Sequence, residues 1–151
     1  MFEHVGRKFY NKFFKSINKL LKNDGLFLLH TIGVVDKPTP HNKFINKYIF
    51  PGGVCPSLSQ IVKPIEKTGL IVADTETLIR HYDKTLLSWL ERFMAKKDLV
   101  KDMFDEKFVK MWSFYLASCA AAFRYRDLVV FQLQIVKNFD TAHPTRDYIY
   151  L

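Results

Sequence analysis

The sequence has few of the residues that mark disulfide-rich, metal-binding or membrane-spanning proteins. It contains only two cysteines, Cys55 and Cys119, and they form neither a CxxC pair nor another metal-ligand spacing. We therefore expect reduced thiols, as in a cytoplasmic protein, and no metal site. No apolar run approaches the length that spans a bilayer, and no apolar signal segment follows the charged first residues. We expect a soluble protein whose membrane contact, if any, is peripheral.

Glycine is scarce as well, which limits the cofactor sites that this chain can build. None of its six glycines belongs to a strand–loop–helix fingerprint of the kind that holds phosphates or nucleosides. By contrast, 48% of the residues are apolar and 15% are aromatic, including fourteen phenylalanines. Over 151 residues this composition favours one packed domain rather than a disordered chain.

Positive charge is in excess, and it is unevenly distributed. The chain has 23 basic and 15 acidic residues, and residues 1–50 hold nine of the basic ones against three acids. Such a surplus favours an anionic partner, either nucleic acid or phospholipid headgroups. No aromatic residues recur on the basic face as a base-stacking platform, so we do not expect nucleic acid. A solvated, lysine-rich face with no partner is the alternative interpretation.

Hydrophobic periodicity predicts an α/β domain with three strands. Helical spacing of apolar residues recurs in five segments, which are residues 7–22, 42–50, 57–67, 83–97 (with Asp83 as its cap) and 105–124. Apolar runs without that spacing predict strands at residues 26–32, 70–78 and 128–136. The first run does not alternate with polar residues, which is typical of a parallel strand buried on both faces.

Three strands are few for an α/β domain, and an apolar strand left at a sheet edge is an aggregation hazard. A central strand also needs a neighbour on each side to satisfy its backbone groups. We therefore expect an incomplete sheet whose missing part precedes residue 1.

Five motifs occur in a characteristic order and spacing. They are MFEHVG at 1–6, LHTIG at 29–33, INKYIFPGG at 45–53, HYDKTL at 81–86 and AAFRYRD at 121–127. In this register the chain resembles the carboxy-terminal half of the cyclopropane fatty acid synthases and the related mycolic acid methyltransferases. The resemblance covers residues 1–137, and residues 138–151 form a divergent tail that resembles nothing we can place.

The resemblance implies a class I S-adenosylmethionine-dependent methyltransferase fold, of which this chain holds the last three of seven strands. The family's glycine-rich loop for S-adenosylmethionine lies upstream, so no cofactor-binding residues are assigned here. Met1 coincides with a methionine inside the first motif. We therefore expect a split gene or an internal start site, and a separately encoded amino-terminal half as a partner.

The resemblance also implies an activity and its residues. Family members add a methylene bridge across the cis double bond of a phospholipid acyl chain, with bound bicarbonate as the base. Carried over by motif, Glu3, His30 and the backbone N–H of Ile32 would hold the bicarbonate. Tyr82 would contact the anion through its hydroxyl and stabilise the nearby cation with its ring. Taken singly, each of these side chains has a purely structural interpretation.

Two interpretations of function stay open at this point. In the first, the chain is a methyltransferase fragment that is inactive without its amino-terminal half and lies on the inner face of the cell membrane. In the second, it is a non-catalytic remnant or a lipid-surface module whose basic helix at residues 7–22 meets anionic headgroups. The sequence does not separate cyclopropanation from methylation, because both begin with the same carbocation.

Overall fold

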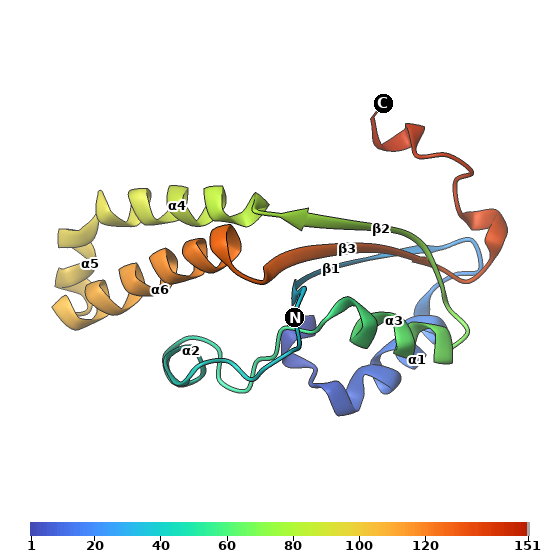
Figure 1. Cartoon of the computed structure of the whole chain (residues 1–151), viewed down its shortest axis with the longest axis horizontal. Helices are drawn as coiled ribbons and strands as arrows, with labels where there is room; N and C mark the ends of the chain where they lie inside the picture. The colour runs from blue at the N-terminus through green and yellow to red at the C-terminus, as the bar shows by residue number, and fades with distance from the viewer. Residues whose placement is uncertain (151) are drawn as a thin grey trace.

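The computed structural model describes residues 1–150, which form a three-stranded sheet and six α-helices (Figure 1). The strands are β1 (Leu26–Val34), β2 (Ile71–Ile79) and β3 (Leu128–Val136). The helices are α1 (Tyr10–Leu20), α2 (Lys43–Tyr48), α3 (Leu58–Lys67), α4 (His81–Met94), α5 (Lys97–Met103) and α6 (Glu106–Tyr125). Short 3-10 helices lie at Phe2–His4, Arg7–Phe9, Phe139–Thr141 and Asp147–Ile149. No helix within this part of the chain is long and apolar enough to cross a membrane.

The sheet has the order β1-β3-β2, and both of its pairings are antiparallel. The prediction of parallel pairing for the first strand is therefore wrong. β1 and β2 run in the same direction, but β3 lies between them and runs the opposite way. The prediction that β1 is buried on both faces is also wrong, because Leu28 is 51% exposed while Leu29 is only 4% exposed. An apolar run therefore does not establish that helices cover both faces of a strand.

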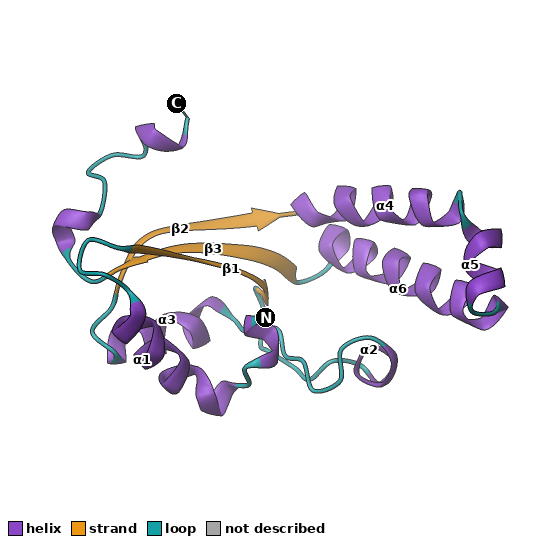
Figure 2. Cartoon of the chain, turned by 180° about the vertical axis from the view of Figure 1, so that it is seen from behind, coloured by secondary structure: helices purple, strands orange, loops and turns teal. Residues whose placement is uncertain are grey.

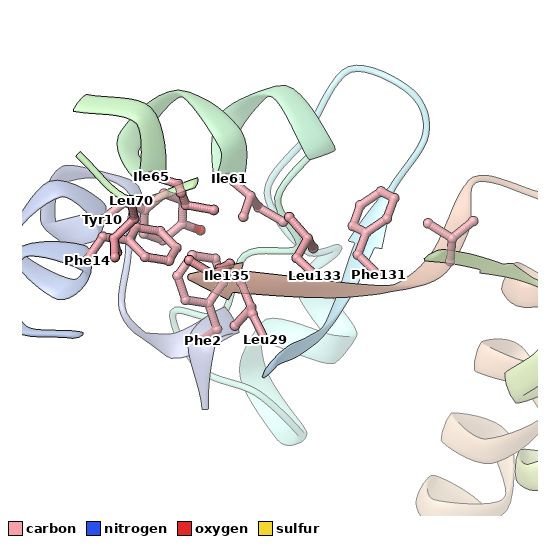
Figure 3. Close-up of a cluster of buried hydrophobic side chains, with 11 residues drawn as sticks. Phe2, Tyr10, Phe14, Leu29, Ile61, Ile65, Leu70, Phe131, Leu133 and Ile135 are labelled. Atoms are coloured by element: carbon pink, nitrogen blue, oxygen red, sulfur yellow. The ribbon is translucent and has the colours of Figure 1, made fainter. Parts of the chain in front are cut away.

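One face of the sheet packs against α1 and α3, which lie side by side beneath it (Figure 2). This first face holds a continuous apolar core. Figure 3 shows side chains from both helices and from β1 and β3 meeting there. Its members are Phe2, Tyr10, Phe14, Leu29, Ile61, Ile65, Leu70, Val129, Phe131, Leu133 and Ile135. Because adjacent strand residues point to opposite faces, these β3 residues alternate with Val130, Gln132 and Gln134 on the second face.

Gly33 shows why the LHTIG motif ends in glycine. A Cβ at this position would lie 2.2 Å from the ring of Phe131 and 2.7 Å from the carbonyl oxygen of Pro56. The Phe131 side chain is 2% exposed and has no room to move away. A residue without a side chain is therefore required where β1 crosses the core.

The second face is covered mainly at one end, by the bases of α4 and α6. These helices form a hairpin that extends beyond the sheet, with α5 at its far end (Figure 1). Leu86, Leu116 and Phe123 belong there to one apolar cluster with Val130 of β3. The predicted helix at 83–97 is α4, which ends at Met94, and α5 was not predicted. Asp83 lies in the first turn of α4 rather than at its cap.

β1 is an edge strand, as the incomplete-sheet prediction requires. Ile32 lies opposite Val130, but its N–H is bonded to Glu3 rather than to β3. In an antiparallel pair, residues two apart direct their backbone groups to the same side. The backbone groups of Leu28 and His30 therefore also face the open edge.

The last residues return to the second face of the sheet. Arg146 forms an ion pair with Asp74 of β2 at 2.8 Å, and the Tyr148 hydroxyl donates to Gln134 of β3 at 2.7 Å. These contacts connect the segment from 138 to 150 to the sheet. The boundary drawn at residue 137 stays a prediction.

Candidate functional site

Glu3 lies at the open edge of β1 and is held there by hydrogen bonds. Its Oε1 accepts from the Thr31 hydroxyl at 2.7 Å and from the Ile32 N–H at 2.8 Å. Its Oε2 is 3.1 Å from the amino group of Met1. The backbone carbonyl of Glu3 also accepts from the N–H of Val54 at 2.9 Å. Because an edge strand leaves alternate N–H groups unpaired, β1 can offer the Ile32 donor to this side chain.

The environment of Glu3 favours its ionised form. Burial alone would raise the pKa of this carboxyl, but the hydrogen bonds from Thr31 and Ile32 outweigh burial and hold the pKa below its usual value. Hydrogen bonds to a carboxylate favour the charged form. At neutral pH Glu3 is therefore an acceptor, suited to a ligand that brings its own hydrogen.

His30 lies on the second face of the sheet, one residue before Thr31. Adjacent strand residues point to opposite faces, so Thr31 enters the first core while His30 is exposed on the other side. The Nδ1 of His30 is 3.0 Å from the side-chain nitrogen of Gln132 on β3. This contact orients the imidazole, and Nε2 makes no hydrogen bond to any residue from 1 to 150.

Tyr82 is the second residue of α4 and packs over the same end of the second face. Its ring centroid is 5.3 Å from that of Phe123 and 5.9 Å from that of Trp89. Tyr82 and Ile32 both pack against the cluster formed by Leu86, Phe123 and Val130. The structure thus places the side chains of His30, Ile32 and Tyr82 on one face.

The four predicted residues are therefore brought together in part. Glu3 contacts Ile32 directly, and His30, Ile32 and Tyr82 share a face of the sheet. Within the described residues, Glu3 forms no hydrogen bond with His30 or Tyr82. Their roles in holding an anion stay predictions.

An ion pair that the sequence did not indicate fixes the base of the α4–α6 hairpin. Arg124 donates to the carboxylate of Asp83 at 2.7 Å, and this hydrogen bond lowers the pKa of Asp83. Asp83 is 5% exposed, so the pair is partly buried. It links the residue after Tyr82 to the residue after Phe123. The two residues lie in separate motifs, HYDKTL and AAFRYRD, but sequence spacing does not show that these motifs meet.

Thr31 was also missed, because a threonine between His30 and Ile32 reads as an ordinary strand residue.

The nearby thiols are unsuited to catalysis. Burial raises the pKa of Cys55 to about 12 and that of Cys119 to about 11, so both are protonated at neutral pH. No group of three His, Cys, Asp or Glu side chains between residues 1 and 150 is arranged to hold a metal ion.

Comparisons with known proteins agree with this arrangement. The family model "Mycolic acid cyclopropane synthetase" matches residues 1–133. The chain is 42% identical to the cyclopropane-fatty-acyl-phospholipid synthase of Escherichia coli, over 94% of this chain and 37% of that protein. It is 34% identical to the tuberculostearic acid methyltransferase UfaA1 of Mycobacterium tuberculosis, over 91% of this chain and 34% of that protein.

Solved structures show the same likeness in three dimensions. The mycolic acid cyclopropane synthase CmaA1, solved with SAH and CTAB, is 32% identical and superposes with a TM-score of 0.81. That match covers 89% of this chain and 52% of CmaA1. The chain thus spans about a third of the length of its curated relatives and corresponds to part of a methyltransferase fold. It belongs to the mycolic acid cyclopropane synthetase family.

Proposed function

We propose that this chain is the carboxy-terminal half of a methyltransferase that builds a methylene bridge on the cis double bond of a phospholipid acyl chain. The observation that carries the proposal is the Glu3 carboxylate at the open edge of β1. It is hydrogen-bonded to Thr31 and Ile32, which are distant from it in the sequence. His30 and Tyr82 occupy the adjoining face. The names of the relatives support a lipid substrate and methyl transfer.

S-adenosylmethionine would supply the transferred carbon as an electrophilic methyl group. The CmaA1 structure contains SAH, and this chain covers about half of that protein. None of the glycines here forms a nucleoside-binding loop. We therefore assign the S-adenosylmethionine site to residues outside this chain, in an amino-terminal half that would complete the sheet along the edge of β1.

The side chains present fit a small protonated oxyanion such as bicarbonate. Glu3 would accept a hydrogen bond from its hydroxyl, and His30 would donate one to it through Nε2. The N–H of Ile32 holds Glu3 in this structure at 2.8 Å, so it would help to hold the anion through that carboxylate. A bound bicarbonate would supply a weak base beside the acyl chain.

The proposed reaction places a positive charge next to Tyr82. The alkene would form a bond to the methyl carbon while the bond from that carbon to the sulfonium sulfur breaks and S-adenosylhomocysteine leaves, which puts a carbocation on the acyl chain. Loss of a proton from the new methyl group would then close the ring. The electron-rich face of Tyr82 favours a cation, and the rings of Phe123 and Trp89 keep the Tyr82 ring in place.

We also propose that the chain works in the cytoplasm and lies peripherally on the inner face of the cell membrane. The lysines of α1 support this proposal, since each lysine near an anionic membrane contributes about 1 kcal/mol of attraction. The same lysines support the second candidate, a lipid-surface module without catalysis. Both candidates predict salt-sensitive binding to vesicles, so only turnover distinguishes them.

Mixing this chain with a purified amino-terminal half and assaying methyl transfer to unsaturated phospholipid tests the enzymatic proposal. We expect turnover in the mixture, with losses of at least a hundredfold in Glu3→Ala and His30→Ala, as for other groups that hold a catalytic acid or base. Glu66→Ala, on the outer face of α3, and His143→Ala, in the tail, are matched controls and should keep full activity. Turnover unaffected by Glu3→Ala, or no turnover with any amino-terminal half, would leave only the lipid-surface module.

A further inference from the structure

A polar groove of about 430 Å³ lies between the start of α1 and the outer side of α3, away from the predicted site. Tyr10 and Pro64 contribute its apolar surface. The rest of its lining consists of six cationic or hydrogen-bonding side chains, which are Arg7, Asn11, Ser59, Gln60, Lys63 and Lys67. No acidic side chain lines it.

The three cations of the groove have no acidic partner. Among residues 1–150, neither Arg7, Lys63 nor Lys67 forms an ion pair. Arg7 makes one hydrogen bond, to the carbonyl oxygen of Pro38 at 3.3 Å. Lys63 and Lys67 are four residues apart, so they lie on the same side of α3. Three like charges that converge on one groove repel each other unless an anion lies between them.

The two helical segments that border the groove carry much of the net charge of the chain. Residues 7–22 and 57–67 together hold eight Lys or Arg and one acid, Glu66, whereas the whole chain has a net charge of +8. The helices that pack on the first face therefore carry most of the positive charge that the chain has in excess. An anion would meet the strongest attraction on this side of the molecule.

Tyr10 lies between the groove and the first core. Tyr10 is 2% exposed, and its buried hydroxyl has no hydrogen-bond partner in the described residues. A buried hydroxyl without a partner is unfavourable and calls for an explanation. This hydroxyl is buried in the first core rather than open to the groove, so the cations and neutral donors of the lining are the contacts available to an anion.

We propose that this groove binds a phosphate group, of the kind that a phospholipid headgroup carries. Guanidinium and ammonium groups with neutral donors beside them are the usual partners of phosphate oxygens. The proposal deepens the proposed function, since it names the part of a phospholipid that this chain recognises. It makes no use of Glu3, His30 or Tyr82.

Binding measurements with a pair of double variants test the groove. Lys63→Gln with Lys67→Gln removes two charges from the groove, and Lys15→Gln with Lys19→Gln removes two from α1 outside it. Vesicles of phosphatidylcholine with phosphatidylglycerol are one probe, and inorganic phosphate followed by NMR shifts is the other. Both variants lose the attraction of two charges, and we expect the groove variant to bind the vesicles about tenfold more weakly than the control, because it also loses direct contacts with a phosphate. Phosphate should shift the Arg7 signal in the unmodified chain and in the control variant, but not in the groove variant.

Equal losses in the two double variants would overturn the proposal, because they would show diffuse attraction without a site. Tighter binding to an oligonucleotide than to either phosphate probe would overturn it as well. Shifts caused by inorganic phosphate without vesicle binding would support the groove but assign it to a free phosphate. These experiments do not measure turnover. The groove proposal can therefore fail while the methyl-transfer proposal holds, and the methyl-transfer proposal can fail while the groove proposal holds. Thermal unfolding of each variant checks that these exposed substitutions leave the fold intact.

Discussion

The two faces of the sheet differ in how completely helices bury them. The first face is closed by α1 and α3 and contains side chains such as Phe14, Leu133 and Ile135 that are fully buried. The second face is closed at one end by the α4–α6 hairpin, and Leu28 and His30 remain exposed beside it. Stability and chemistry are thus separated. The residues proposed to act on a substrate lie on the open face and at the open edge, where a ligand can reach them.

This difference also fits the length of the relatives. The chain covers 37% of the Escherichia coli synthase and 52% of CmaA1, so those proteins have further residues to place against a sheet of this kind. The open edge of β1 and the exposed part of the second face are the surfaces left for such residues here. The first face needs no such addition, because α1 and α3 already bury its core.

The largest expected effect compares two leucines that lie on opposite faces. Leu133→Ala removes a side chain that is fully buried in the first core, and it should destabilise the fold by about 3–5 kcal/mol. Leu28→Ala makes the same change at a position that is 51% exposed, and it should cost no more than about 0.5 kcal/mol. Urea unfolding of both variants measures the difference. Similar losses would show that the second face is as well packed in solution as the first.

A smaller change in stability, of opposite sign, is expected at the unpaired Tyr10 hydroxyl of the first core. Tyr10→Phe removes the hydroxyl that is buried without a partner and keeps the ring that stacks on Phe2 at 4.5 Å. Because an unpaired buried hydroxyl is unfavourable, the variant should gain about 1 kcal/mol of stability. Thermal unfolding in phosphate-free buffer checks this value. A loss of stability would show that the hydroxyl has a partner in solution.

The smallest effect concerns Glu3, at the border between the two faces. Its pKa in the folded chain is below the usual value of 4.5, so its ionised form stabilises the fold above that pH. This contribution is lost as the pH falls through 4.5 and then through the lower folded value. Glu3→Gln should therefore lose less stability than the unmodified chain between pH 6 and pH 3. Glu66→Gln, at an exposed carboxylate, is the control, and an equal response of the two variants would refute the lowered pKa.

Local sequence patterns predicted most elements of the fold because each element has a local cause. Ser57 and Gln60 form the capping box that starts α3, and β3 matches the predicted run at residues 128–136. Strand direction was mispredicted, since the apolar run of β1 carries no information about its partner. The helix α5 was missed because it is only seven residues long and buries none of them, so it leaves little apolar periodicity.

The sequence motifs predicted which residues belong to the candidate site, but not all of the contacts among them. Glu3 and Ile32 were expected to act together, and the structure shows them in direct contact. The carboxylate contact of Thr31 and the pairing of Asp83 with Arg124 were not predicted. Both depend on which distant segments fold side by side, and periodicity does not contain that information.

The Asp83–Arg124 ion pair gives the hairpin a fixed pivot. α6 has 20 residues, so at about 1.5 Å per residue its far end lies about 30 Å from that pivot. By simple leverage, a tilt of about 5° at the base would move α5 by about 3 Å along this length. Tyr82 would shift by only a small fraction of that distance, because it stands at the pivot. Any tilt of the hairpin about this pair would therefore move α5 much further than the Tyr82 ring.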